Sequence, residues 1–169
     1  IRAEDGGKRW RILTGWQMTE VQDVSLDWAE PGSIYIAMAD GIGFSADGGA
    51  TWTHRDSGIV RKFAQSVQVD RSRAGRVLAG AEQGIFVSGN RGMAWKLAGA
   101  RGKMITDLKQ SARDPRRWMA TAQRGGLFAS TDNGATWAAI ALEFGKQTLY
   151  SVSLDPHEVR RVAVCGWEA

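Results

Sequence analysis

The sequence predicts an all-β fold, a β-propeller of four-stranded antiparallel blades, with about four blades in this chain. Three observations support it: a loop motif that recurs about every 42 residues, strand-like segments with the same period, and a composition rich in turn residues. Twenty-one glycines and eight tryptophans among 169 residues are typical of short strands that are joined by tight turns. We expect one domain over residues 1–169, with repeats at about 1–44, 45–87, 88–129 and 130–169.

The recurring motif is an eight-residue loop that ends in tryptophan. The sequence SADGGATW at 45–52 returns as STDNGATW at 130–137, and more loosely as SGNRGMAW at 88–95 and AEDGGKRW at 3–10. The four tryptophans are spaced 42, 43 and 42 residues apart. Because this spacing is the length of a four-stranded blade, the motif predicts one such loop in each blade.

The strands of one repeat follow from alternation of apolar and polar residues between turn signals. In the second full unit we expect strands at 66–69, 77–80 and 85–88, with an outer strand that begins at 95–97. Apolar residues keep the same register in all four units, at Val24, Val67, Leu108 and Val152. The repeat is therefore continuous along the chain.

The chemistry of the loop motif favours a structural role. Glycine supplies the positive φ values that a tight hairpin needs, and Asp, Ser and Thr side chains satisfy loop backbone groups. The tryptophan is expected to pack between neighbouring blades. Asn90 in place of Asp would still cap the loop, whereas a catalytic set would not tolerate this change. We therefore assign a structural role to Asp5, Trp10, Ser45, Asp47, Gly49, Thr51, Trp52, Ser88, Asn90, Gly92, Trp95, Ser130, Asp132, Gly134, Thr136 and Trp137.

The pattern S-x-D-x-G-x-T-W at blade spacing resembles the Asp-box, or bacterial neuraminidase repeat, over essentially the whole chain. Similar repeats occur in sialidases, xyloglucanases, sortilin-type receptors and photosystem II assembly-factor-like bacterial proteins. The resemblance implies a periplasmic or secreted protein and a ring of six to eight blades. We therefore expect either a fragment of a larger ring or a homodimer that completes one, and the N-terminal segment could instead complete the C-terminal blade.

Function is expected on the loops that join the outer strand of one blade to the inner strand of the next, together with the hairpins between second and third strands. Basic and aromatic side chains alternate there, as they would for a polyanion, a sugar or an acidic peptide. The candidate ligand-binding residues are Trp16, Arg61, Lys62, Phe63, Arg101, Lys103, Phe144, Lys146, Arg124 and Trp167.

A catalytic alternative rests on two aspartates. Asp23 and Asp107 share one repeat position, at which the other two units have Ser66 and Ser151. A glycoside hydrolase needs such a carboxylate pair, although Asp also caps the start of a strand. The expected function is a non-catalytic scaffold that binds a protein or glycan; the alternative is a secreted glycoside hydrolase, xyloglucanase-like or sialidase-like. Residues 11–13, Arg-Ile-Leu, depart from the Arg-Ile-Pro segment that a sialidase would have.

Several function classes are disfavoured. His54 and His157 are isolated and the glycines precede no helix, so we expect no metal and no cofactor. Cys165 is the only cysteine, which excludes an internal disulfide, and we expect it buried in a strand. The net charge of +4 is spread over interleaved charges, so nucleic-acid binding is not favoured. No apolar stretch approaches the roughly 20 residues that cross a bilayer, so no membrane span is expected.

Overall fold

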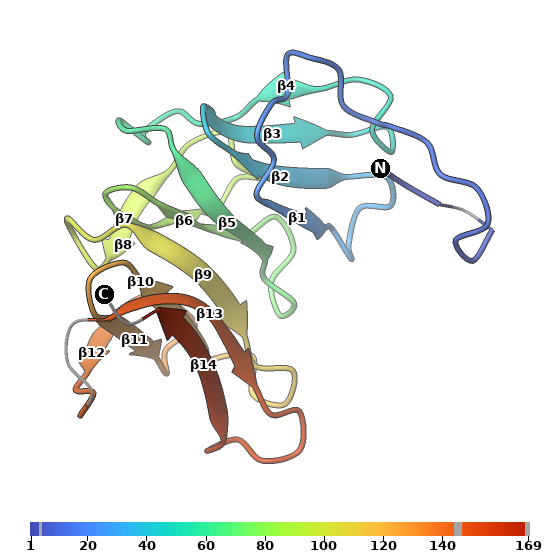
Figure 1. Ribbon diagram of the computed structural model, residues 1–169. Helices are drawn as coiled ribbons and strands as arrows, with labels where there is room; N and C mark the ends of the chain where they lie inside the picture. Colours follow the sequence, from blue (N-terminus) through green and yellow to red (C-terminus); the bar gives the residue numbers. More distant parts are fainter. Residues whose placement is uncertain (4, 144–146, 168–169) are drawn as a thin grey trace.

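The computed structural model describes residues 1–3, 5–143 and 147–167, and this part of the chain contains fourteen β-strands and no helix (Figure 1). Three four-stranded antiparallel sheets and one two-stranded sheet follow one another along the chain. The first strands of consecutive sheets contact each other, as the inner strands of propeller blades do. The expected all-β propeller architecture is confirmed.

The first two blades run in simple up-and-down order. The first contains β1 (Asp23–Leu26), β2 (Ile34–Met38), β3 (Gly41–Ser45) and β4 (Thr53–His54). The second contains β5 (Ala64–Val69), β6 (Val77–Ala81), β7 (Gly84–Ser88) and β8 (Lys96–Gly99). The strands expected at 66–69, 77–80 and 85–88 are present, each within two residues of its expected bounds.

The third blade repeats this order, and the fourth sheet has two strands in the described part of the chain. The third contains β9 (Ile105–Gln110), β10 (Trp118–Ala122), β11 (Gly126–Ser130) and β12 (Ala138–Ile140). The fourth sheet contains β13 (Thr148–Leu154) and β14 (Val162–Trp167). The pairing register is conserved, because Val24, Val67, Leu108 and Val152 lie opposite Ile36, Ala79, Ala120 and Val164 respectively.

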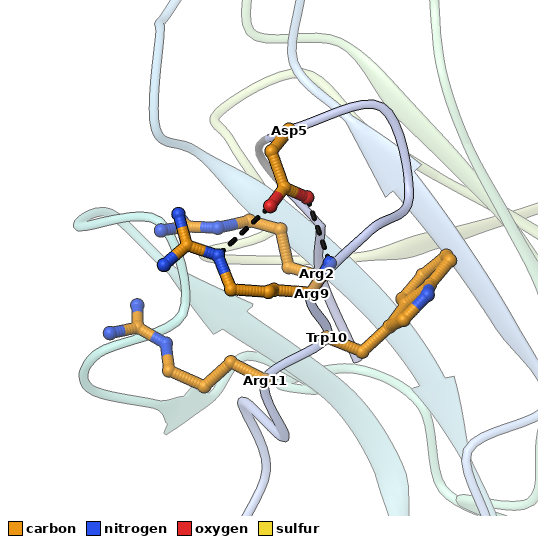
Figure 2. Close-up of a pocket in the computed structure, with 5 residues that line it drawn as sticks. All are labelled: Arg2, Asp5, Arg9, Trp10 and Arg11. Atoms are coloured by element: carbon orange, nitrogen blue, oxygen red, sulfur yellow. Dashed lines mark hydrogen bonds and ion pairs between the residues drawn. The ribbon is translucent and has the colours of Figure 1, made fainter.

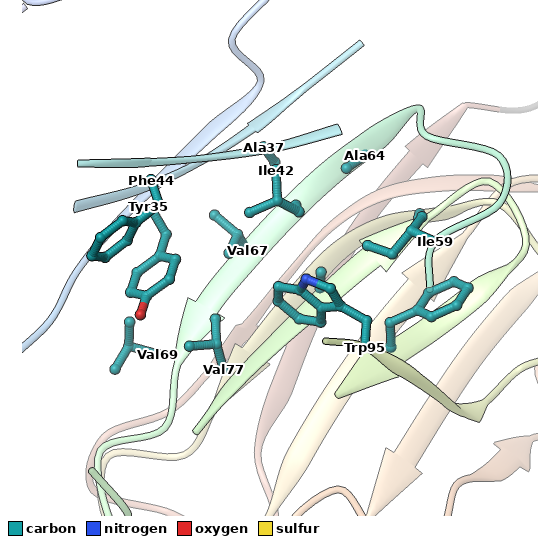
Figure 3. Close-up of a cluster of buried hydrophobic side chains, with 13 residues drawn as sticks. Tyr35, Ala37, Ile42, Phe44, Ile59, Ala64, Val67, Val69, Val77 and Trp95 are labelled. Atoms are coloured by element: carbon teal, nitrogen blue, oxygen red, sulfur yellow. The ribbon is translucent and has the colours of Figure 1, made fainter. Parts of the chain in front are cut away.

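The hydrophobic core lies between blades, where one sheet packs on the next. Figure 3 shows the cluster between the first and second blades, in which Tyr35 and Phe44 face Val67 and Val77, with Trp95 at one side. A second cluster joins the second blade to the third, and a third joins the third blade to β13 and β14. Burial of apolar faces between blades therefore stabilises the arc and fixes where each loop projects.

The N-terminal segment does not complete the C-terminal sheet of its own chain, which corrects the expectation that it could. Arg2 and Arg11 form an antiparallel bridge with N–O distances of 2.8 and 2.9 Å. Arg2 Nη1 also donates to the carbonyl oxygen of Gly48, and Leu13 packs against the first blade. These contacts hold the segment beside the first blade, at the other end of the arc from β13 and β14 (Figure 1).

Cys165 is exposed, which contradicts its expected burial. Val162 and Val164 of β14 pack against the core cluster that the third blade forms with β13. Because side chains alternate along a strand, Cys165 points to the other face of the sheet. No described part of the chain covers that face. Separately, the described residues contain no helix of the length and apolarity that a bilayer crossing requires.

Candidate functional site

Three loops between third and fourth strands share one hydrogen-bond pattern; we call 45–52, 88–95 and 130–137 the repeat loops. In the first, the amide of Gly49 donates to Ser45 Oγ at 2.8 Å. Asp47 accepts from the Thr51 amide at 2.9 Å and from its hydroxyl at 2.7 Å. The Asp47 side chain thus accepts hydrogen bonds from loop groups that have no backbone acceptor in a tight turn.

The other two repeat loops reproduce this pattern. Gly134 donates to Ser130 Oγ at 2.8 Å, and Asp132 accepts from the Thr136 amide at 2.9 Å. In the middle loop, Asn90 Oδ1 accepts from the amide of Ala94 at 3.0 Å. An amide oxygen therefore occupies the place of the carboxylate.

The two loop aspartates remain charged at low pH. Hydrogen bonds from the hydroxyl and the amide of Thr51 lower the pKa of Asp47 to about 2. Those from Thr136 lower the pKa of Asp132 to about 2 in the same way. A carboxylate of this kind is a poor general acid, because it would not carry a proton near neutral pH.

The tryptophans of the motif do not share one environment. Trp95 is buried, and its indole N–H donates to the carbonyl oxygen of Arg55 at 2.8 Å. Trp52 donates to the carbonyl oxygen of Leu13 at 2.9 Å. Trp10, however, is 62% exposed and lines a pocket of about 330 Å³ with arginines around it (Figure 2). Its expected burial is wrong, because no described blade packs on that side.

Asp23 and Asp107 bind neighbouring blades. Oδ2 of Asp23 accepts from the Ser66 hydroxyl at 3.2 Å and from the Val67 amide at 3.0 Å. Oδ2 of Asp107 accepts from the Ser151 hydroxyl at 2.8 Å and from the amide that follows it at 3.0 Å. Each aspartate therefore connects the first strand of its own blade to the first strand of the next.

The expected binding loops do lie together; we call their surface the loop face. The backbone amide of Glu82, in the hairpin between β6 and β7, donates to the carbonyl oxygen of Phe63 at 3.0 Å. The loop after β8 donates from Gly102 N to the carbonyl oxygen of Gln83 at 2.9 Å. These bonds place each hairpin against a loop between blades.

The candidate residues of the loop face differ in their partners. Arg61 pairs with Glu82 at 2.8 Å, and Lys62 pairs with Asp56 at 3.1 Å. Phe63 is half-buried, whereas Trp16 and Trp167 are among the most exposed large hydrophobic side chains of the described residues. The remaining described cations of the set are exposed and form no ion pair with any described residue: Arg101, Lys103 and Arg124. Phe144 and Lys146 lie outside the described residues.

Two pockets on the loop face were not found by sequence reasoning. The first loop pocket, of about 280 Å³, is lined by Val60, Phe86, Leu97 and Arg101 among others. The second loop pocket, of about 240 Å³, is lined by Lys103, Phe128, Ile140 and Leu142 among others. The sequence repeat does contain a signal for these pockets, because Phe86 and Phe128 occupy the same position in successive blades.

Metal ligation has no support from this geometry. Among residues 1–3, 5–143 and 147–167, no group of three His, Cys, Asp or Glu side chains could hold an ion. His54 lies in the outer strand β4, and His157 lies in the turn between β13 and β14.

Comparison with solved structures identifies the architecture. The chain is similar to an ancestral GH74 enzyme, with a TM-score of 0.77 and 19% identity over 86% of this chain and 21% of that chain. The chain is a β-propeller. It is also similar to YCF48 bound to a D1 peptide, with a TM-score of 0.69 and 17% identity over 96% of this chain and 52% of that chain. A third similar structure is the GH74 xyloglucanase from Xanthomonas campestris, with a TM-score of 0.66 and 16% identity over 81% of this chain and 26% of that chain.

These likenesses concern the fold alone. The propeller chain spans between about a fifth and a half of the length of these three proteins. No protein-family model matches the sequence, and no curated protein matches it.

Proposed function

We propose that this propeller is a non-catalytic scaffold of the Asp-box class that binds a segment of a partner protein on its loop face. The observation that supports the proposal most strongly is the set of hydrogen bonds that Asp23 and Asp107 accept. Both are bound at both carboxylate oxygens by groups of the protein itself.

A glycoside hydrolase needs one carboxylate that attacks or activates water and a second carboxyl group that protonates the leaving oxygen. Asp107 Oδ1 accepts from the Leu108 amide at 2.8 Å and pairs with Lys109 Nζ at 3.0 Å, while Oδ2 holds the next blade. Breaking these bonds to reach a substrate would also loosen two blades. The carboxylates therefore act as blade connectors in this proposal.

The loop face supports binding of a protein segment. Arg101, Lys103 and Arg124 are exposed cations without an ion-pair partner in the described part of the chain. Trp16 and Trp167 are exposed aromatic side chains, of the kind that anchors protein interfaces. The similar structure of YCF48 was solved with a D1 peptide bound, which favours a peptide over other ligands.

The catalytic alternative is a glycoside hydrolase, since two of the similar structures are GH74 enzymes. The test incubates the full chain with xyloglucan and with a sialylated oligosaccharide and measures release of reducing sugar and of sialic acid. We expect no release from the wild type. Release that disappears in Asp23→Asn and Asp107→Asn, in variants that circular dichroism shows to be folded, would establish the enzyme and refute the scaffold.

A further inference from the structure

The two loop pockets are repeats of one another. In the first, Phe86 of β7 lies opposite Leu97 of β8, and both line the pocket. In the second, Phe128 of β11 lies opposite Ala139 of β12, and both line the pocket. Each pocket therefore has an apolar floor that is formed by the outer half of a blade.

One loop borders both pockets. Residues 100–104 join β8 to β9, and Arg101 lines the first loop pocket while Lys103 lines the second. Gly102 N donates to the Gln83 carbonyl oxygen at 2.9 Å, and the Met104 carbonyl oxygen accepts from Gln123 N at 3.0 Å. The loop is thus bound to hairpins of two successive blades, which fixes the two cations on either side of it.

Electrostatics restricts what could occupy both pockets. Arg101 and Lys103 are exposed and make no ion pair with a described residue, and Arg124 lies on the hairpin next to the second loop pocket. Apolar side chains line part of both pockets, with Val60 and Leu97 in the first and Ile140 and Leu142 in the second. A ligand that fits has apolar groups at two places and negative charge between them.

We propose that the two loop pockets bind one extended acidic peptide, with an apolar side chain in each pocket and carboxylates on Arg101 and Lys103. This inference rests on the proposed function and names the class of partner. In an extended peptide, alternate side chains point to one side, so an apolar residue, two acidic residues and a second apolar residue at alternate positions can all face the protein together. A neutral glycan would leave Arg101 and Lys103 without an anionic partner.

The probe is a fluorescein-labelled heptapeptide, LSDSESL, titrated with the full chain while anisotropy is measured. Two matched peptides separate the contributions: LSKSKSL reverses the charges, and SSDSESS removes the apolar side chains. We expect each control to bind at least about tenfold more weakly than LSDSESL. Equal binding of either control, or no binding of LSDSESL at a protein concentration on the order of 1 mM, overturns the inference.

Variants place the peptide on the molecule. Arg101→Ala and Lys103→Ala should each weaken LSDSESL binding by about three- to fivefold, as loss of an exposed ion pair does. Val60→Asp puts a negative charge at the first loop pocket and should weaken binding of the peptide further. Val60 is 82% exposed, so folding should be unaffected. The matched control is Arg73→Ala, an exposed arginine in the turn between β5 and β6.

The outcomes also separate this inference from the proposed function. Binding that is weakened by Arg124→Ala or Trp167→Ala, but unchanged in all three pocket variants, would place the peptide elsewhere on the loop face and refute only the pocket inference. Binding that only Arg73→Ala weakens would refute both. Weakening by the pocket variants, with Arg73→Ala like the wild type, supports both.

Discussion

The hydroxyl of Ser151 on β13 donates a 2.8 Å hydrogen bond to Oδ2 of Asp107 on β9. Asp23 makes the equivalent bond to Ser66 at 3.2 Å between the first and second blades. The junction of the second and third blades uses another pair: Gln110 Nε2 donates to Asp70 Oδ1 at 2.9 Å. Polar side chains on inner strands, or directly after one, thus connect neighbouring blades at each of these junctions.

Replacing Asp107 should destabilise the protein. Asp107→Ala leaves the buried amide of Val152 without its acceptor, so we expect the free energy of unfolding to fall by about 1–3 kcal/mol. Urea unfolding followed by tryptophan fluorescence measures the change. Asp40→Ala, at a side chain that is 54% exposed, is the matched control and should change stability by less than about 0.5 kcal/mol. Equal effects of the two substitutions would refute the connector role.

Two tryptophans at the same motif position should differ sharply in their contribution to stability. Trp95 is only 4% exposed, so Trp95→Ala should cost about 3–5 kcal/mol. Trp10 is 62% exposed, and Trp10→Ala should stay within about 0.5 kcal/mol of the wild type. Thermal unfolding followed by far-ultraviolet circular dichroism compares them. A large loss in Trp10→Ala would show that this tryptophan is covered in solution.

Stability should depend on pH through the repeat loops. The folded-state pKa of Asp47 and of Asp132 is about 2, below the ordinary value of 3.8 for an aspartate. A carboxylate with a lowered folded-state pKa contributes stability above its unfolded pKa, and this contribution is lost as pH falls from about 4 towards 2. Asp132→Asn should therefore be less stable than the wild type at pH 6, and the gap should narrow as pH falls through this window. A gap that is constant from pH 6 to pH 2 would contradict the assignment.

Close packing between blades should make Gly80 intolerant of a side chain. A Cβ there would lie 2.5 Å from Ile105 Cγ2 on the next blade, although the backbone of Gly80 is not left-handed. We expect Gly80→Ala to cost about 1–3 kcal/mol through overpacking. Gly89→Ala serves as the control, because its Cβ would meet nothing within 4 Å. If Gly80→Ala and Gly89→Ala have the same melting temperature in thermal unfolding, the blades can separate more easily than the structure indicates.

The sequence by itself determined the elements whose causes are local. Turn chemistry and strand alternation located β5, β6 and β7 to within two residues, and one motif identified the hydrogen bonds of Asp47 and Asp132. These depend on residues a few positions apart, so a linear pattern contains them.

The tertiary structure alone decided what depends on a neighbouring blade. Asp107 meets Ser151 across 44 residues, and the two loop pockets combine outer strands with a loop from between blades. Trp10 and Trp95 share a motif position but differ in burial, because a neighbouring blade covers Trp95 and no described blade covers Trp10. Burial is set by what packs on a residue, and the repeat pattern of one chain does not specify that for its outermost units.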